Sequence, residues 1–113
     1  MAENFSTEVN ATDEATIIHV RGEIDVATAG RLRDAIEPHM GPEQTIVLDL
    51  SEVEFMDSTA LGVLIEARTK LDNGRAFFLA APGLETKRAL QISGLDRHFS
   101  VHDTVPEALV AKI

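Results

Sequence analysis

The chain has 113 residues, 44 % of them hydrophobic, which is enough for one compact domain with an ordinary core and too few for two. Its net charge of −9, from 19 acidic and 10 basic residues, repels phosphate backbones and argues against direct nucleic-acid binding. The sequence has no cysteine, no apolar run long enough to span a membrane and no N-terminal secretory signal. We therefore expect a soluble, cytoplasmic domain with no membrane partner.

Residues 5–21 predict a β-hairpin. Apolar and polar residues alternate over 5–9, as in a strand with one wet face. A polar turn at 10–14 leads to a second strand over 15–20. His19 lies in this second strand and has no second metal ligand nearby in sequence, so we interpret it as structural.

A helix is predicted next, over 27–40, because apolar residues at 29, 32, 35 and 36 share one face. Pro38 lies near its end and 41–42, a Gly-Pro pair, marks the stop. Asp25 stands just before this helix, where its side chain can cap the helix N-terminus.

The most informative stretch is 45–74. Residues 45–50 are mostly β-branched and apolar, which is typical of a strand buried on both faces of a parallel sheet. Eight residues, 51–58, connect it to a helical pattern that ends at an Asn-Gly pair, 73–74. On this helix Glu66 and Lys70 form an i,i+4 pair. The apolar residues with helical spacing are Leu61, Leu64, Ile65, Ala67 and Leu71.

Asp57 and Ser58 lie where this strand leads into the helix, and either side chain is a good N-cap. Ser58, Gly62, Glu66 and Thr69 fall on the face opposite the apolar arc, towards solvent. A glycine within a helix lowers stability by about 1 kcal/mol. Gly62 therefore suggests a place where a partner approaches closely.

The last third of the chain predicts two more strands and two more helices. Strands are expected over 75–80 and 99–102, and a helix over 84–93 that ends at Gly94 and is followed by an apolar contact from Leu95. Thr104 caps the final helix. Two strands followed by alternating helices and strands predict an α/β fold with a mixed sheet.

The segment VLDLSEVEFMDSTALGVLIEA, residues 47–67, resembles the STAS family, and especially its bacterial anti-sigma factor antagonists. These proteins carry an Asp-Ser-x-(Gly/Ala)-Leu-Gly signature, which residues 57–62 match, with Ala60 where many members have glycine. Segments 22–28, 87–90 and 93–97 also resemble the corresponding family segments. The resemblance implies a single STAS domain over 1–113, with a mixed four- to five-stranded sheet packed with about four helices.

The resemblance also implies a function. The unphosphorylated family member binds an anti-sigma factor with a GHKL-type serine kinase fold and so releases a sigma factor. The kinase phosphorylates the signature serine, Ser58 here, and a PP2C-type phosphatase reverses the reaction. ATP and magnesium belong to the kinase, so the chain itself is expected to need no cofactor, to bind no metal and to be no enzyme. The expected partner-binding residues are Asp25, Asp57, Ser58, Thr59, Gly62 and Glu66.

Two other functions remain open from the sequence. One is a phosphorylation-independent STAS scaffold or sensor module of the stressosome kind. The other is a small serine hydrolase, but Ser58 lacks the Gly-x-Ser-x-Gly elbow and no pattern links it to His98 or His102 as a base.

Overall fold

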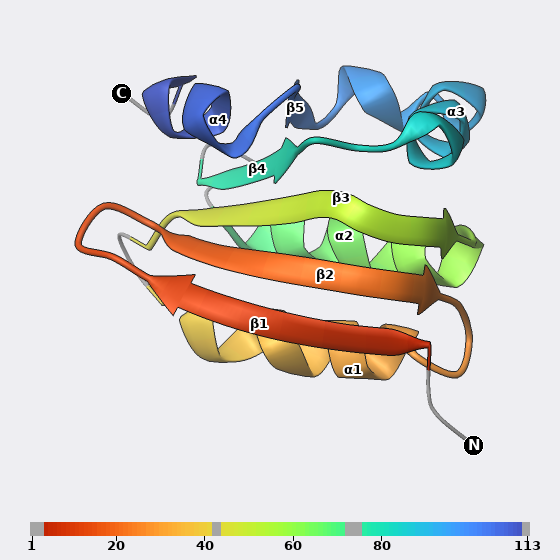
Figure 1. Ribbon diagram of the computed structural model, residues 1–113, viewed down its shortest axis with the longest axis horizontal. Coiled ribbons are helices and arrows are strands. Elements are labelled where there is room, and N and C mark those ends of the chain that lie inside the picture. The colour runs from red at the N-terminus through yellow and green to blue at the C-terminus, as the bar shows by residue number, and fades with distance from the viewer. Residues whose placement is uncertain (1–3, 42–43, 72–75, 112–113) are drawn as a thin grey trace.

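The computed structural model describes residues 4–41, 44–71 and 76–111 (Figure 1). In chain order the elements are β1 (Phe5–Ala11), β2 (Thr16–Ile24), α1 (Ala29–Ile36), the 3-10 turn η1 (Glu37–His39), β3 (Ile46–Met56), α2 (Ser58–Lys70), β4 (Phe77–Ala80), α3 (Leu84–Ser93), the 3-10 turn η3 (Leu95–Arg97), β5 (Ser100–His102) and α4 (Val105–Ala111). Within these described ranges, no helix is long and apolar enough to cross a bilayer.

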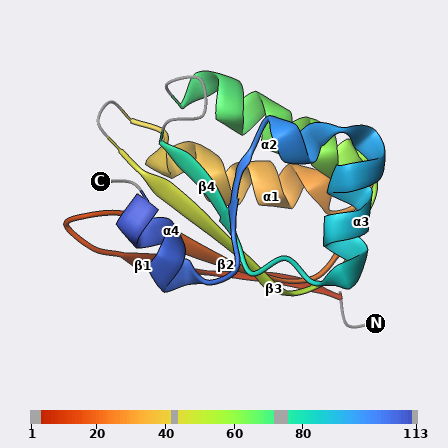
Figure 2. The same cartoon turned by 90° about the horizontal axis from the view of Figure 1, so that it is seen from above.

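The five strands form one sheet in the order β1-β2-β3-β4-β5. β1 pairs antiparallel with β2, and the other neighbours pair in parallel, so the predicted mixed sheet and the predicted hairpin are both confirmed. Helices α1 and α2 lie along one face of the sheet, and α4 lies on the other (Figure 2). Where α4 packs against β3, β4 and β5, the parallel part of the sheet is therefore covered on both sides, as its continuous apolar runs require.

The larger core lies between the sheet and the helices α1, α2 and α3. Its fully buried members include Ile18, Leu32, Leu48, Leu64 and Leu90. A smaller core lies on the opposite face, where Ile17, Val47 and Phe78 pack near Ala108 of α4. Within the run 45–50 that was predicted to be buried on both faces, burial is confirmed for 46–48 and Leu50, whereas Thr45 and Asp49 are half-buried.

The third strand is longer than the sequence predicts. The prediction ended it at residue 50 and treated 51–58 as a connection, but β3 runs on to Met56. Val53 and Met56 remain buried under the helices. Two register shifts against β2 add extra residues to β3, and such bulges break the alternation by which a strand is recognised.

The first helix is shorter than predicted. The expected range was 27–40, whereas α1 covers only Ala29–Ile36 and the chain then tightens into η1. Pro38 lies within η1, and a proline cannot donate the hydrogen bond that an α-helix needs there. The stops expected at Pro42 and at Asn73-Gly74, and the strand start at Arg75, lie outside the described residues.

The C-terminal third follows the sequence closely. Helix α3 has the predicted bounds, and Gly94 ends it with a φ of +78°, in the left-handed region that glycine favours. Leu95 then packs against the larger core, as expected. The Thr104 hydroxyl accepts a hydrogen bond from the Glu107 amide at 3.2 Å, which confirms the predicted cap of α4.

Candidate functional site

The junction between β3 and α2 is built by Asp57. Its backbone is extended, and its Oδ1 atom accepts a hydrogen bond from the Ala60 amide at 3.1 Å. Its own amide donates to the Ile24 carbonyl at 3.1 Å, which ties the junction to the end of β2. Asp57 is therefore the N-cap. Ser58, the other candidate, is the first residue of the helix.

The outer face of α2 is open around Ser58. Ser58, Thr59 and Gly62 are exposed, whereas Ala60, Val63, Leu64 and Ala67 are buried. A Cβ atom added at Gly62 would meet nothing within 4 Å. Gly62 therefore does not serve helix packing. Ile65 is 42 % exposed, so its predicted place in the buried arc was wrong; it lies beside the open face.

Glu66 is engaged within the chain. Its Oε1 atom lies 3.1 Å from Arg33 Nε on α1 and 3.8 Å from Lys70 Nζ on its own helix. The second contact confirms the predicted i,i+4 pair, and the first joins the two helices. The Glu66 carboxylate thus has a structural role in the free chain.

The loop before α1 is held by a reciprocal pair, Asp25 and Thr28. Asp25 Oδ1 accepts hydrogen bonds from the amides of Ala27, at 2.9 Å, and of Thr28, at 3.2 Å. In return, Thr28 Oγ1 accepts from the Asp25 amide at 2.9 Å. Asp25 therefore caps the turn that precedes α1 rather than the helix itself, whose N-cap residue is Thr28.

This loop lies beside the start of α2. Ile24 and Met56 are partners in the β2–β3 register, and the Ile24–Asp57 backbone hydrogen bond continues it. Two large apolar side chains at this edge are exposed, Val26 at 77 % and Phe55 at 48 %. Neither is predicted from the sequence. Phe55 falls in the expected connection 51–58, and the exposure of an apolar residue in a loop leaves no periodic pattern.

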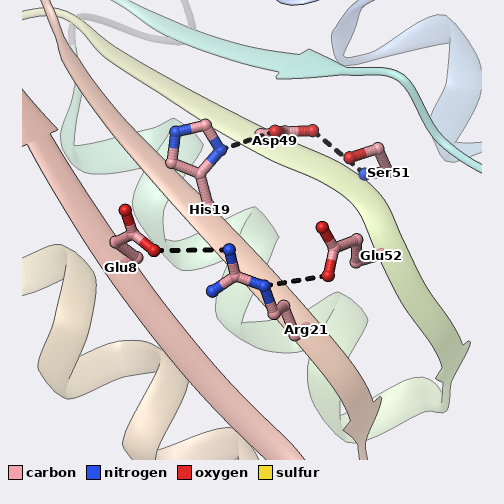
Figure 3. Close-up of polar contacts among 6 residues, drawn as sticks. All are labelled: Glu8, His19, Arg21, Asp49, Ser51 and Glu52. Atoms are coloured by element: carbon pink, nitrogen blue, oxygen red, sulfur yellow. Dashed lines mark hydrogen bonds and ion pairs between the residues drawn. The ribbon is translucent and has the colours of Figure 1, made fainter.

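A separate polar cluster spans β1, β2 and β3 on the face that α4 leaves open (Figure 3). Arg21 Nε lies 2.8 Å from Glu52 Oε2, and its Nη2 lies 3.3 Å from Glu8 Oε1. These contacts, first of all the hydrogen bond with Glu52, raise the pKa of the Arg21 guanidinium. The cluster cross-links three strands at their surface.

His19 belongs to the same cluster, and its predicted structural role is confirmed. Its Nδ1 atom lies 2.6 Å from Asp49 Oδ2, and Asp49 Oδ1 accepts from the Ser51 amide at 3.0 Å. Partial burial of Asp49 works to raise the pKa of its carboxyl group, but the hydrogen bonds from Ser51 and His19 outweigh it and hold the pKa below its ordinary value. Asp49 is therefore an ionised acceptor at neutral pH.

The hydrolase interpretation gains no support from the geometry. Among the described residues, Ser58 makes no hydrogen bond with a histidine; His102 Nε2 instead lies 2.8 Å from Ser100 Oγ on β5. In the same ranges, no three His, Asp or Glu side chains are grouped so as to hold a metal ion.

Comparisons with known proteins agree on one family. Residues 6–108 match the STAS domain. The chain is 35 % identical over 94 residues to the anti-sigma-F factor antagonist RsfB of Mycobacterium tuberculosis, covering 82 % of this chain and 77 % of that protein.

The fold of this chain is also similar to that of several solved structures. An anti-sigma factor antagonist from Mycobacterium paratuberculosis matches with a TM-score of 0.85 at 35 % identity, covering 95 % of this chain and 92 % of that one. The Bacillus cell fate determinant SpoIIAA in its phosphorylated form matches with a TM-score of 0.67 at 25 % identity, covering 95 % and 97 % of the two chains. With the five-stranded mixed sheet and the match over 6–108, this chain belongs to the STAS domain family.

Proposed function

We propose that this STAS domain is an anti-sigma factor antagonist whose binding to its anti-sigma factor is switched off by phosphorylation of Ser58. One observation carries the proposal: Ser58 is exposed in the first turn of α2, beside an N-cap that does not need its hydroxyl. The names of the relatives from the two Mycobacterium species support the antagonist role. The existence of a phosphorylated relative with the same fold supports the switch.

The phosphoryl group comes from a partner with a GHKL-type kinase fold, which supplies ATP and magnesium. The bond between the γ-phosphorus and the oxygen bridging to the β-phosphate breaks, and a bond from Ser58 Oγ to that phosphorus forms. The hydroxyl proton passes to a base on the kinase. A PP2C-type phosphatase later hydrolyses the phosphoserine, so this chain acts as the protein substrate in both steps.

The modified serine remains compatible with a folded helix. The N-terminus of a helix carries free amides and about half a positive charge, both of which favour an anion there. The capping hydrogen bond belongs to Asp57 and survives the modification. Phosphorylation thus alters the surface of α2 without unfolding it.

Loss of binding follows from charge and bulk. The phosphoryl group adds about −1.5 to −2 charges, and it faces a kinase site that holds nucleotide phosphates. Like charges across an interface cost several kcal/mol, and 1.4 kcal/mol already changes affinity about tenfold. Because Gly62 leaves the neighbouring turn bare, the partner approaches closely enough to sense the change.

We propose Asp57, Ser58, Thr59 and Gly62 as the direct contact surface. Asp25 and Glu66 belong to it mainly through the loop and the helix pair that they hold in place.

The test begins with the partner. An anti-sigma factor captured on the immobilised chain is purified and incubated with the chain, ATP and magnesium, and peptide mass mapping then locates the phosphate. One phosphoryl group on Ser58 is expected, and in a Thr59→Ala protein the phosphate should still be found on Ser58. Phosphorylation of Thr59 in a Ser58→Ala protein at the wild-type rate would contradict the assignment.

Titration calorimetry then tests the switch. Ser58→Ala should bind the purified anti-sigma factor as the wild type does, and Ser58→Glu should bind it at least tenfold more weakly. Equal affinities would remove the phosphorylation switch. Large homotypic assemblies without a kinase partner would favour the scaffold or sensor function instead.

A further inference from the structure

We propose that Val26 is a specificity-determining anchor of this surface, inserted into an apolar pocket of the anti-sigma factor that is flanked by lysine and arginine side chains. Thr28 is the positioning residue that presents it. The proposal rests on the proposed function, because it names the contact by which the same partner is recognised.

Val26 is held outward by the structure of its loop. Its side chain is 77 % exposed, yet the residues on either side of it are fixed. Asp25 Oδ1 accepts from the amides of Ala27 and Thr28, at 2.9 and 3.2 Å. Thr28 Oγ1 accepts from the Asp25 amide and donates to the Glu23 carbonyl, both at 2.9 Å. A pre-formed loop loses little conformational freedom on binding, so an apolar side chain on it contributes more of its burial to affinity.

The same hydrogen bonds change the role of Asp25. Its Oδ1 atom is engaged inside the turn and orders the backbone on both sides of Val26. The group that this loop presents to a partner is therefore the valine side chain. Central apolar contacts of this kind carry much of the energy of protein interfaces.

Val26 lies next to the backbone contact that joins the end of β2 to Asp57, the residue before Ser58. It follows Ile24 by two residues, and the Ile24 carbonyl accepts from the Asp57 amide at 3.1 Å. Phe55, opposite Glu23 in the β2–β3 register, adds a second exposed apolar side chain at this edge. A partner that reaches Ser58 Oγ thus meets the 25–28 loop in the same approach.

Charge selects the kind of pocket. The two segments that meet at this edge, 22–30 and 53–62, contain no lysine or arginine. Their acidic residues are Glu23, Asp25, Glu54 and Asp57. An apolar anchor on so acidic a surface fits an apolar pocket with a cationic rim, because such a rim attracts this surface and repels a basic competitor.

Binding of the purified anti-sigma factor, measured by titration calorimetry, tests the anchor. Val26→Ala should weaken binding about tenfold, since two buried carbons are lost from the contact. Val110→Ala is the matched control: this valine is also exposed, at 69 %, but lies on α4, which packs on the other face of the sheet. The control should bind within twofold of the wild type. Equal binding by Val26→Ala and Val110→Ala would overturn the proposal.

A double-mutant cycle tests the positioning role of Thr28. Thr28→Val keeps the shape but removes the hydroxyl that bridges Asp25 and Glu23, and it should weaken binding about fivefold, whereas Thr28→Ser should restore it. If Thr28 acts through Val26, adding Thr28→Val to Val26→Ala should cause no further loss. Additive losses would mean that Thr28 does not act through the valine, and would overturn its assignment.

Salt dependence tests the cationic rim, because salt screens exposed charges. Raising NaCl from about 0.05 to about 0.5 M should weaken wild-type binding several-fold. An unchanged affinity would overturn the proposed cationic rim of the partner's pocket.

The variants Ser58→Ala and Ser58→Glu distinguish failure of this proposal from failure of the proposed function. If Ser58→Ala and Ser58→Glu differ but Val26→Ala binds normally, the Val26 proposal alone fails. If the Ser58 variants bind alike but Val26→Ala binds about tenfold more weakly than Val110→Ala, the phosphorylation switch alone fails.

Discussion

The Asp57 carboxylate accepts a hydrogen bond from the Ala60 amide at 3.1 Å, and this contact leaves the neighbouring Ser58 hydroxyl exposed at the start of α2. Two adjacent polar residues therefore have separate roles. One holds the helix end, and the other is available for chemistry. A serine that both capped the helix and accepted phosphate would couple each modification to the stability of α2.

The division of roles predicts different effects on stability. Asp57→Ala should lower the free energy of unfolding by about 0.5–2 kcal/mol, because the capping hydrogen bond is lost. Ser58→Ala should change it by less than about 0.5 kcal/mol, as is usual for an exposed position. Urea unfolding followed by circular dichroism measures both. If the serine variant were the less stable of the two, Ser58 would be the cap.

Gly62→Ala should raise stability and weaken partner binding. A Cβ atom at this position meets nothing within 4 Å, so alanine is accommodated and favours the helix by about 0.4–1 kcal/mol. The added methyl group lies one turn from Ser58, on the proposed contact surface. Thermal melts and titration with the anti-sigma factor check the two effects. A variant that is more stable and binds normally would remove Gly62 from the interface.

Gly22→Ala should be strongly destabilising. Gly22 has a φ of +94°, and a Cβ atom there would lie 2.0 Å from the Asn4 carbonyl oxygen, so β1 and β2 would have to separate locally. Gly94→Ala is the control, since its φ of +78° is also left-handed but its surroundings are open. The Gly94→Ala control should lower the free energy of unfolding by about 1–2 kcal/mol, the penalty of a left-handed conformation alone. Denaturant unfolding should show a much larger loss for Gly22→Ala. Equal losses for the two variants would show that the chain near Asn4 moves aside without a further energetic penalty.

The lowered pKa of Asp49 predicts that the free energy of unfolding decreases at acidic pH. Its pKa in the folded chain is below the ordinary value of about 3.9 expected in the unfolded chain. The carboxylate therefore stabilises the fold above about pH 4, and this contribution is lost as the pH falls through the folded-state pKa. The difference in unfolding free energy between the wild type and Asp49→Asn should be full at pH 7 and shrink below pH 4.

A second variant provides the control for Asp49. Asp13→Asn changes an exposed carboxylate in the turn between β1 and β2. Urea unfolding of both variants and of the wild type at each pH separates the loss of the Asp49 contacts from the loss of one negative charge. A difference for Asp49→Asn that does not shrink below pH 4 would show that His19 and Ser51 do not hold the Asp49 pKa down.

Several features of this protein were predictable from the sequence because they depend on local chemistry. The buried run at 46–48 required a strand covered on both faces, and Gly94 required the end of α3. The 57–62 signature located the exposed serine, because a helix start and its solvent face follow from capping residues and helical periodicity. The family resemblance, carried by the same residues, is borne out by the match over 6–108.

Other features depended on neighbours that are distant in the chain. The sequence does not show that β3 extends to Met56, because bulges against β2 interrupt the alternation of buried and exposed residues. Whether Asp57 or Ser58 is the N-cap depends on the backbone geometry at the junction of β3 and α2. The pair of Glu66 with Lys70 was predicted from helical spacing, but its contact with Arg33 at 3.1 Å exists only because α1 and α2 pack together. No pattern in the sequence predicts that the Val26 side chain is exposed. Its exposure follows from the hydrogen bonds between Asp25 and Thr28 and from the backbone bond between Ile24 and Asp57, which joins residues more than thirty positions apart, and a contact at that separation exists only once the sheet has formed.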